Sequence, residues 1–403
     1  MFDNATVFLL GAGASWHYGY PTGEELVKKV EATAREVANF CRQSHRIAVQ
    51  PRFVKEKTTG GSTKELENGW YAAAAECEEL AVRLQRVNPL VIDYFLGLNR
   101  RLENVGKLMI SLVLLRCEAK FLEGAGNINR KEALEKSPLK RDREEGSTVN
   151  ISLYKDDWYR FILHRLVTDC PLSIDLLKKN VSFVTFNYDV SLEYVLWNGL
   201  RAIEFFDPKD VDEFFSPKRV LHIYGKIRDY PKEDVLKSSV DWDQLFPNSR
   251  DLDRENWENS IFVLDEAYEA SANLKVIDPH TKADNSSEIS AAIEAINTAS
   301  VVYILGYGFD KNNNKRIGLN ASLLLNENKS PKCVMFANFG NSDRINKSSS
   351  RLFFGKIDQF GISMPFAYER GGYYYEKSIR DVYQALEMDF DSLEDQFGAG
   401  SPS

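Results

Sequence analysis

The chain of 403 residues is 43% hydrophobic and 27% charged, a composition that is typical of a soluble globular protein and excludes general disorder. No segment approaches the roughly 20 apolar residues that cross a bilayer, and the N-terminus carries no visible secretory signal, so we expect a cytoplasmic protein without membrane association. The formal net charge of -8 argues against direct nucleic-acid binding through phosphate neutralisation.

The N-terminal segment predicts a strand, a tight turn and a helix. The apolar run from Ala5 to Leu10 is too short for a helix and stops at Gly11-Ala12-Gly13, which favours a buried parallel strand. Thr22 and Glu25 fit a capping box, so a helix is expected to begin there and to continue through residues 26–37.

Helical patterns dominate the next part of the chain. The predicted helices are Tyr71–Val87, Leu90–Arg101, Val105–Leu122 and Trp158–Cys170. Two polar stretches, 52–69 and 124–150, predict mobile surface loops. We therefore expect a large helical module inserted into an α/β domain.

Strand signals return in the second half of the chain. The predicted strands are Val181–Phe186, Arg219–Tyr224, Val301–Leu305 and Lys332–Ala337, and the predicted helices between or after them are 189–197, 287–296 and 376–388. This alternation predicts an α/β fold with a Rossmann-like, doubly wound parallel sheet. The expected domains are residues 1–30 with 179–365 for the Rossmann-like unit, 31–178 for the helical insertion, and 366–403 for a C-terminal helix and flexible acidic tail.

Four predicted strands end in glycine-rich or polar motifs, and ligands bind at the carboxyl ends of strands in open parallel sheets. The first motif is Gly11-Ala12-Gly13-Ala14-Ser15, whose small residues let backbone N–H groups approach a diphosphate. The alternative is a tight strand-to-helix turn, because position 16 is Trp where the Rossmann pattern has its third glycine, and no clear acidic ribose partner follows.

The second and third motifs offer an amide and an imidazole. Asn187 can hold a ribose hydroxyl or a water without changing protonation, while Asp189 either orients a polar partner or caps the following helix. His222 and Tyr224 share one face of their strand, and a histidine titrates near neutral pH, as a general base requires. The alternative for His222 is a hydrogen-bonded structural residue.

The fourth motif, Gly306 to Asp310, is a second glycine turn that can pass beside a nucleotide with Tyr307 and Phe309 against it. The alternative is a loop in which glycine and asparagine tolerate left-handed backbone angles. Asn338 follows the next strand and either contacts a ribose or forms a turn.

Cysteine and histidine spacing argues against a metal site. The five cysteines are widely separated and contain no C-x-x-C pair, and the five histidines show no metal-ligand spacing. No metal is therefore expected.

Taken in chain order, the four motifs resemble the sirtuin-like family. The resemblance rests on residues 11–15 with Gly19-Tyr20-Pro21-Thr22-Gly23, then 185–189, 222–225 and 306–310. It is closer to the bacterial branch that hydrolyses NAD in antiphage defence than to the protein deacylases, and Ile92–Leu96 is also similar to a segment of that branch.

Several departures from the deacylase pattern argue against an acyl-lysine substrate. The chain has no four-cysteine zinc ribbon and no arginine soon after the glycine-rich loop, and Phe186 stands where deacylases carry Gln. The family's catalytic histidine directly precedes the glycine, a position that is Tyr224 here, whereas His222 lies two residues earlier. Either residue is thus a candidate for the position of the base.

The resemblance implies an NAD hydrolase that cleaves the nicotinamide–ribose bond, with NAD as substrate. Asn187 would orient the ribose and the attacking water, His222 would accept a proton, and Asp189 would orient a partner or cap its helix. The resemblance implies that the residues contacting the dinucleotide are Gly11, Ala12, Gly13, Ser15, Thr22, Tyr224, Gly306, Tyr307, Phe309 and Asn338.

The resemblance also implies that the enzyme acts in abortive infection and that its activity is controlled by assembly. The expected assembly is a homo-oligomer with a partner protein, for which a hexameric HerA-type ATPase is the expected candidate. Two alternatives stay open. One is an NAD or ADP-ribose sensor without turnover, and the other is an NAD-dependent protein deacylase.

Overall fold

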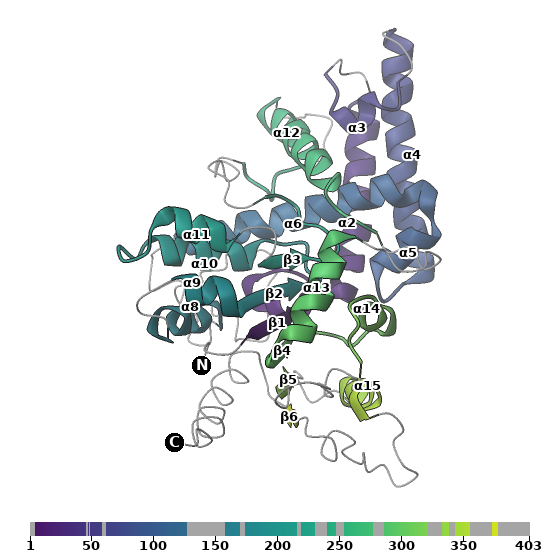
Figure 1. Cartoon of the computed structure of the whole chain (residues 1–403). Helices are drawn as coiled ribbons and strands as arrows, with labels where there is room; N and C mark the ends of the chain where they lie inside the picture. Colours follow the sequence, from purple (N-terminus) through teal and green to yellow (C-terminus); the bar gives the residue numbers. More distant parts are fainter. Residues whose placement is uncertain are drawn as a thin grey trace, which may run out of the picture.

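The computed structural model describes residues 5–45, 47, 49–58, 62–126, 158–169, 174–215, 219–229, 240–246, 254–276, 286–320, 333–337, 343–354 and 373–377. Helices surround one central sheet, so the fold is α/β (Figure 1). Among the described residues, no helix is long and apolar enough to cross a membrane.

Over the described residues, the sheet has six parallel strands in the order β3-β2-β1-β4-β5-β6 (Figure 1). They are β1 (Thr6–Leu10), β2 (Val181–Thr185), β3 (Val220–His222), β4 (Val301–Leu305), β5 (Cys333–Ala337) and β6 (Tyr373–Lys377). The chain starts at the centre of the sheet, adds β2 and β3 on one side of β1, and continues with β4, β5 and β6 on the other side.

The register brings four strand ends level with one another. Leu10, the last residue of β1, pairs with Thr185 of β2 and with Leu305 of β4. Thr185 in turn pairs with His222, the last residue of β3. The motifs that follow β1, β2 and β4 and the one that begins at His222 therefore lie at one edge of the sheet.

The three central strands are buried along their whole length, which explains their uninterrupted apolar sequences. Every residue of β1, β2 and β4 is buried. Phe8 stacks on Phe183 and on Tyr303, with ring centroids 5.1 and 5.2 Å apart, so one aromatic row crosses the three strands. Parallel strands that are covered on both faces show this continuous apolar pattern instead of alternation.

A run of helices lies between β1 and β2 in the chain, and it includes helices in the segments where the sequence predicts them. They are α1 (Ala12–Ser15), η1 (Trp16–Tyr18), α2 (Gly23–Gln43), α3 (Arg52–Lys55), α4 (Thr63–Val87), α5 (Ile92–Leu98), η2 (Arg100–Leu102), α6 (Glu103–Gly126), α8 (Trp158–Asp169) and α9 (Ile174–Asn180). Thr22 and Glu25 form the predicted capping box of α2. The buried apolar side chains of these helices form one cluster with those of the sheet, while a separate domain at 31–178 stays a prediction.

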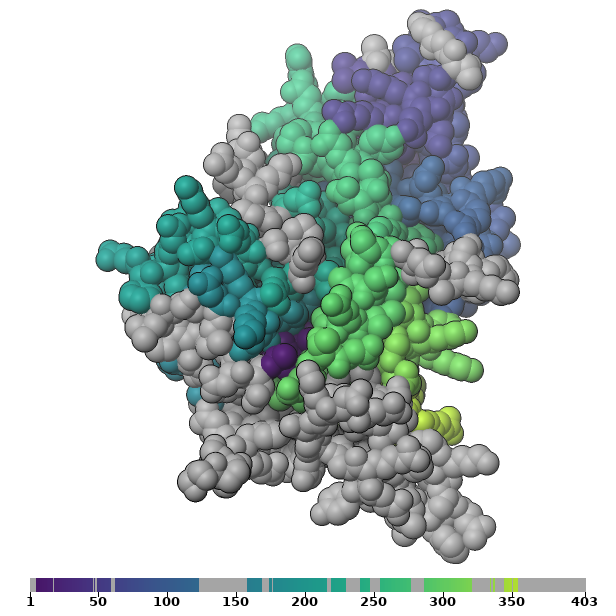
Figure 2. All heavy atoms as spheres, in the orientation of Figure 1, coloured from purple at the N-terminus to yellow at the C-terminus, as the bar shows by residue number. Residues whose placement is uncertain are grey.

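The remaining helices are α10 (Ser191–Arg201), α11 (Pro208–Phe214), α12 (Arg254–Ser271), α13 (Ser287–Thr298), α14 (Lys311–Arg316) and α15 (Asp343–Phe354). Helix α13 crosses the near side of the sheet in Figure 1. Helix α12 packs against α6 and meets α3 in the upper part of the molecule (Figure 2), where the Arg52 N–H donates to Asp265 at 2.6 Å and the Arg52 guanidinium pairs with Glu269.

Three expectations from the sequence are wrong. Part of the stretch 52–69 is helical, because Ser62 and Glu65 form a second capping box at the start of α4. Glu376 and Lys377 belong to β6 and not to a helix, since β6 pairs with β5, and the aromatic run that begins at Tyr373 favours a strand. The sheet thus extends past residue 365, the expected domain boundary. Helix α12 was not predicted. Residues 127–150 and 378–403 lie outside the described residues.

The glycine turn after β1 packs directly against the turn after β4. The Gly11 N–H donates to the Leu305 carbonyl at 2.9 Å, and the Gly13 N–H donates to the Gly306 carbonyl at 3.0 Å. Gly306 has φ +61°, and a Cβ added there would lie 2.1 Å from the Ala14 nitrogen. No side chain fits at this crossing, because both the backbone angle and the close approach require glycine.

We expect Gly306→Ala to lower the free energy of unfolding by at least about 2 kcal/mol, since it adds a left-handed backbone penalty to a backbone clash. Gly308→Ala is the matched control, because no atom lies within 4 Å of a Cβ added there. It should change stability by no more than about 0.5 kcal/mol. Urea unfolding followed by circular dichroism measures both, and equal effects of the two substitutions would contradict the packing argument.

Candidate functional site

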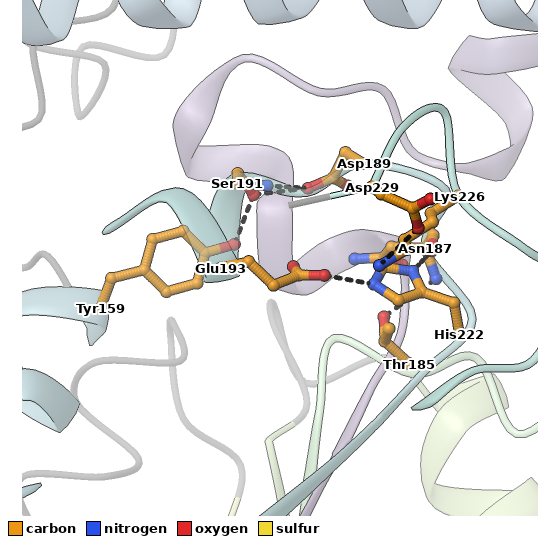
Figure 3. A network of polar contacts seen from close by, with 9 residues as sticks. All are labelled: Tyr159, Thr185, Asn187, Asp189, Ser191, Glu193, His222, Lys226 and Asp229. Carbon is orange, nitrogen blue, oxygen red and sulfur yellow. Dashed lines mark hydrogen bonds and ion pairs between the residues drawn. The ribbon is translucent and has the colours of Figure 1, made fainter. Parts of the chain in front are cut away.

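Asn187 lies just beyond the carboxyl end of β2, where three of the four motifs meet. Its Nδ2 donates to the Ser15 Oγ at 3.1 Å, and its backbone N–H donates to the Thr185 Oγ1 at 3.0 Å. Its backbone carbonyl accepts from the Nδ1 of His222 at 2.8 Å (Figure 3). The structure therefore brings Ser15, Asn187 and His222 together, from segments that are far apart in the sequence.

Both ring nitrogens of His222 are engaged. A carbonyl oxygen only accepts, so Nδ1 carries a proton, and Nε2 lies 2.7 Å from the Oε1 of Glu193 (Figure 3). The side chains of His222 and Glu193 are 4% and 3% exposed. The role of general base expected for His222 is not supported, because no ring nitrogen is left to take a proton from a substrate or water.

Glu193 is held as a carboxylate despite its burial. Burial by itself raises the pKa of this group, but the charge and hydrogen bond of His222, the charge of Lys226 and a backbone hydrogen bond together outweigh it. The pKa of Glu193 is thus lowered from its ordinary value. Glu193 is a site residue that the sequence analysis missed, because it lies on α10 while its partner His222 lies on β3, in a later segment of the chain.

Asp189 anchors the start of α10. Its Oδ1 accepts from the Ser191 N–H at 3.2 Å and from the Ser191 hydroxyl, and Ser15 also hydrogen-bonds to this carboxylate. The Tyr159 hydroxyl lies 2.7 Å from the Ser191 Oγ (Figure 3). Burial raises the pKa of Asp189, while these hydrogen bonds oppose the shift. Asp189 therefore accepts from the first N–H of α10, next to the N-cap residue Val190, and its carboxylate engages Ser15. The expected contact with Asn187 or His222 is not found among the described residues.

The donors and acceptors around Ser15 leave one acceptor of Asn187 without a partner. The Asn187 amide donates to Ser15, and the Ser15 hydroxyl is left to donate to Asp189. The Oδ1 of Asn187 is buried, and within the described part of the chain it accepts no hydrogen bond. A buried amide oxygen in this state is suited to a hydroxyl group or a water molecule.

The first glycine turn does not offer the expected phosphate donors. The N–H groups of Gly11 and Gly13 are used by the carbonyls that end β4, and the Ala14 N–H donates to the Gly11 carbonyl at 2.8 Å. Thr22 is also occupied, because its N–H and its hydroxyl both donate to Glu25. The diphosphate contacts expected from these groups are therefore not supported, and the alternative of a tight turn is the better description.

The aromatic residues of the third and fourth motifs point into the core. Tyr307 and Phe309 are buried, the Tyr307 hydroxyl donates to Asn314 at 2.9 Å, and Phe309 packs on Phe336. The expected nucleotide contacts of these two residues are not supported. Phe186 is half-buried and stacks on Tyr307, with centroids 5.1 Å apart. Asn338 lies outside the described residues.

Tyr224 is not a base either. Its hydroxyl donates to the Oδ1 of Asn313, and the guanidinium of Arg316 lies 5.6 Å from the centroid of its ring. Burial raises the pKa of Tyr224 well above its ordinary value, and Arg316 only partly opposes this effect. Of the two candidates for the position of the base, neither presents a group that is ready to accept a proton.

Two helices from the part of the chain between β1 and β2, α5 and α6, reach the strand ends through charged side chains. Asp93 of α5 accepts from the Tyr188 hydroxyl, just after β2. Glu118 of α6 pairs at 2.7 Å with Arg228, in the segment after β3, and these side chains are 6% and 10% exposed. Asp93 lies in the segment 92–96 that carries part of the family resemblance, which was the available signal for it.

Burial raises the pKa of Asp93 to about 6, although the hydrogen bond from Tyr188 favours the charged form. The segments that face the strand ends are thus held by buried polar contacts on several sides. Among the described residues, no group of three or more His, Cys, Asp or Glu side chains is arranged to hold a metal ion.

Comparison with protein-family models, with curated proteins and with solved structures finds no match to this chain. The functional argument therefore depends on the geometry of the site and on the motifs.

We expect the Asp93 carboxyl to make stability depend on pH. Its pKa in the folded protein is about 6, against an ordinary 3.8, so the folded state binds more protons than the unfolded state between these values. Stability from this group is thus present at low pH and lost as pH rises from about 4 to 6, by roughly 3 kcal/mol in total.

Asp93→Asn should remove this pH dependence, and Tyr188→Phe should extend it to higher pH, because it removes a hydrogen bond that favours the charged carboxylate. The measurement is the difference in unfolding free energy between the wild type and each variant at several pH values. An Asp93→Asn difference that is constant from pH 4 to 7 would contradict the assignment.

Proposed function

We propose that the protein binds NAD and hydrolyses its nicotinamide–ribose bond, which yields nicotinamide and ADP-ribose. The observation that carries the proposal is the state of Asn187. Its side chain and its backbone are both fixed by hydrogen bonds to buried groups, and its amide oxygen is left as an acceptor at the end of β2.

The chemistry asks little of an acid or a base. The nicotinamide ring is a cationic leaving group, so the C1′–N bond breaks with its electron pair going to the ring nitrogen, through a transition state that resembles an oxocarbenium ion. Water adds at C1′ and loses a proton to solvent. In this mechanism the Asn187 amide oxygen accepts a hydrogen bond from the attacking water or from a ribose hydroxyl, and so fixes its position.

The strand order supports a dinucleotide as the ligand. We take the sheet to be a Rossmann-like, doubly wound sheet, in which the crevice lies outside the ends of β1 and β4. Because the N–H groups of Gly11 and Gly13 are occupied, the dinucleotide would lie over Asn187, Phe186 and the exposed Gly308 instead of in the first glycine turn.

The cellular role is proposed from the resemblance alone. NAD depletion by a cytoplasmic enzyme would serve antiphage defence, and an enzyme that destroys a shared cofactor needs control. We propose that this control comes from homo-oligomer formation and from a partner, with a hexameric HerA-type ATPase as the candidate.

One alternative has a specific observation in its favour. Both ring nitrogens of His222 are engaged and Tyr224 is not a base, which is compatible with an NAD or ADP-ribose sensor that does not turn over its ligand. Hydrolysis of a cationic glycoside does not depend on a strong base, so we place the sensor second. The deacylase alternative is not favoured by any contact at the site.

Asn187→Ala should reduce nicotinamide release at least about 100-fold, because it removes a preorganised polar group at the reacting centre. Ser15→Ala, which releases the Asn187 amide and removes a donor to Asp189 but keeps the Asn187 side chain, should cost about tenfold. Asn198→Ala is the matched control, since this exposed asparagine of α10 donates to the Tyr194 carbonyl of its own helix and lies outside the candidate site. Nicotinamide and ADP-ribose are quantified by mass spectrometry.

Three outcomes of that assay would count against the proposal. Release that is unchanged in Asn187→Ala rejects the site. Binding of ADP-ribose without any turnover by the wild type supports the sensor. Turnover that strictly requires an acetyl-lysine peptide supports the deacylase.

Specific activity should rise with protein concentration, and should rise further when a HerA-type partner is added, if assembly completes the active state. Nicotinamide release is measured at protein concentrations that span about two decades around the assembly midpoint. The oligomeric state is followed by mass photometry. A constant specific activity in a chain that stays monomeric would reject control by assembly.

A further inference from the structure

We propose that Glu193 is a positioning residue, which holds His222 as an imidazolium that donates to Glu193 on one side and to the backbone of Asn187 on the other. The reaction that it serves rests on the proposed function. The protonation state of His222 is a separate claim and is tested separately.

The hydrogen bonds allow only two protonation states. Nδ1 of His222 donates to the Asn187 carbonyl in both. In the first state Nε2–H donates to an ionised Glu193, and in the second a protonated Glu193 donates to a neutral ring. The two states have the same shape and the same net charge, and they differ only in which side chain holds the shared proton. The surrounding charges therefore decide whether the pair is ionised or neutral.

The surroundings favour the charged pair. Glu193 lies in the first turn of α10, where the helix dipole favours a negative charge. Lys226, from the segment after β3, also acts on this carboxylate in favour of its charged form, whereas Asp189 is the neighbouring group of like charge. A helix N-terminus and Lys226, which also pairs at 3.4 Å with the exposed Asp229 (Figure 3), thus stand against one buried carboxylate that Ser15 and Ser191 already engage.

The consequence is that Asn187 is held at its backbone N–H, at its backbone carbonyl and at its side chain. Its N–H donates to Thr185, its carbonyl accepts from His222, and its side chain is fixed by Ser15. An imidazolium donates a charge-assisted hydrogen bond that is about twice as strong as a neutral one. Loss of the Glu193 charge should therefore loosen the residue that orients the substrate, without removing any atom that touches it.

The decisive variant is Glu193→Gln, because it keeps the shape and both hydrogen bonds while removing the charge. The probe is the side-chain ¹⁵N spectrum of protein labelled at its five histidines, with His222 assigned from His222→Gln. In the wild type at pH 7.5 we expect both ring nitrogens of His222 to show imidazolium shifts, because both then carry a proton. In Glu193→Gln the ring should be neutral at pH 7.5, with the proton on Nδ1.

Activity provides the second readout. Glu193→Gln should lower kcat for nicotinamide release about tenfold with KM changed less than about twofold, as expected for a change in orientation at the reacting centre. Glu204→Gln is the matched control, because this exposed carboxylate follows α10 and makes no ion pair with any described residue. Thermal unfolding of each variant checks that the fold is kept.

The outcomes separate this inference from the proposed function. A wild-type His222 that is neutral at pH 7, or a Glu193→Gln spectrum that is unchanged, overturns the inference whether or not NAD is cleaved. An imidazolium in a wild-type protein that releases no nicotinamide supports the inference about His222 and rejects the proposed hydrolase. Normal kcat in Glu193→Gln with a neutral His222 rejects the positioning role.

Discussion

The candidate site depends on one residue, Asn187, whose backbone and side chain are fixed by hydrogen bonds from three directions. Thr185 comes from the strand that precedes it, Ser15 from the turn after β1, and His222 from the end of β3. These three residues can reach one asparagine only because the parallel register makes the strand ends level. The position of this amide is thus a property of the whole sheet and not of a single loop.

The helical insertion takes part in the same arrangement, although it lies far from these segments in the sequence. Trp158 of α8 donates to the Ala14 carbonyl at 2.9 Å, Asp93 of α5 accepts from Tyr188, and Glu118 of α6 pairs with Arg228. Each contact joins an insertion helix to the segment that follows a different strand. A movement of the insertion would therefore act on the segments after β1, β2 and β3, which offers a physical route by which assembly can affect the site.

What the sequence predicts well is local, and what it misses depends on distant partners. The continuous apolar runs predict β1, β2 and β4 because burial on both faces leaves that pattern, and the capping box of α2 is visible as Thr22 and Glu25. The use of the Gly11 and Gly13 N–H groups by the end of β4 is a long-range contact that the motif cannot reveal. The pairing of His222 with Glu193 is of the same kind.

The buried pair of Glu193 and His222 is best explained by specificity and not by stability. Removing two charges from water costs several kcal/mol per ion, and well-packed apolar residues in the same place are often equally or more stabilising. An apolar pair, however, would leave the Asn187 carbonyl without its donor and the peptide free to turn. The ion pair therefore stabilises one orientation of Asn187 among those that the turn after β2 allows, and the proposed reaction at a ribose carbon requires one fixed orientation.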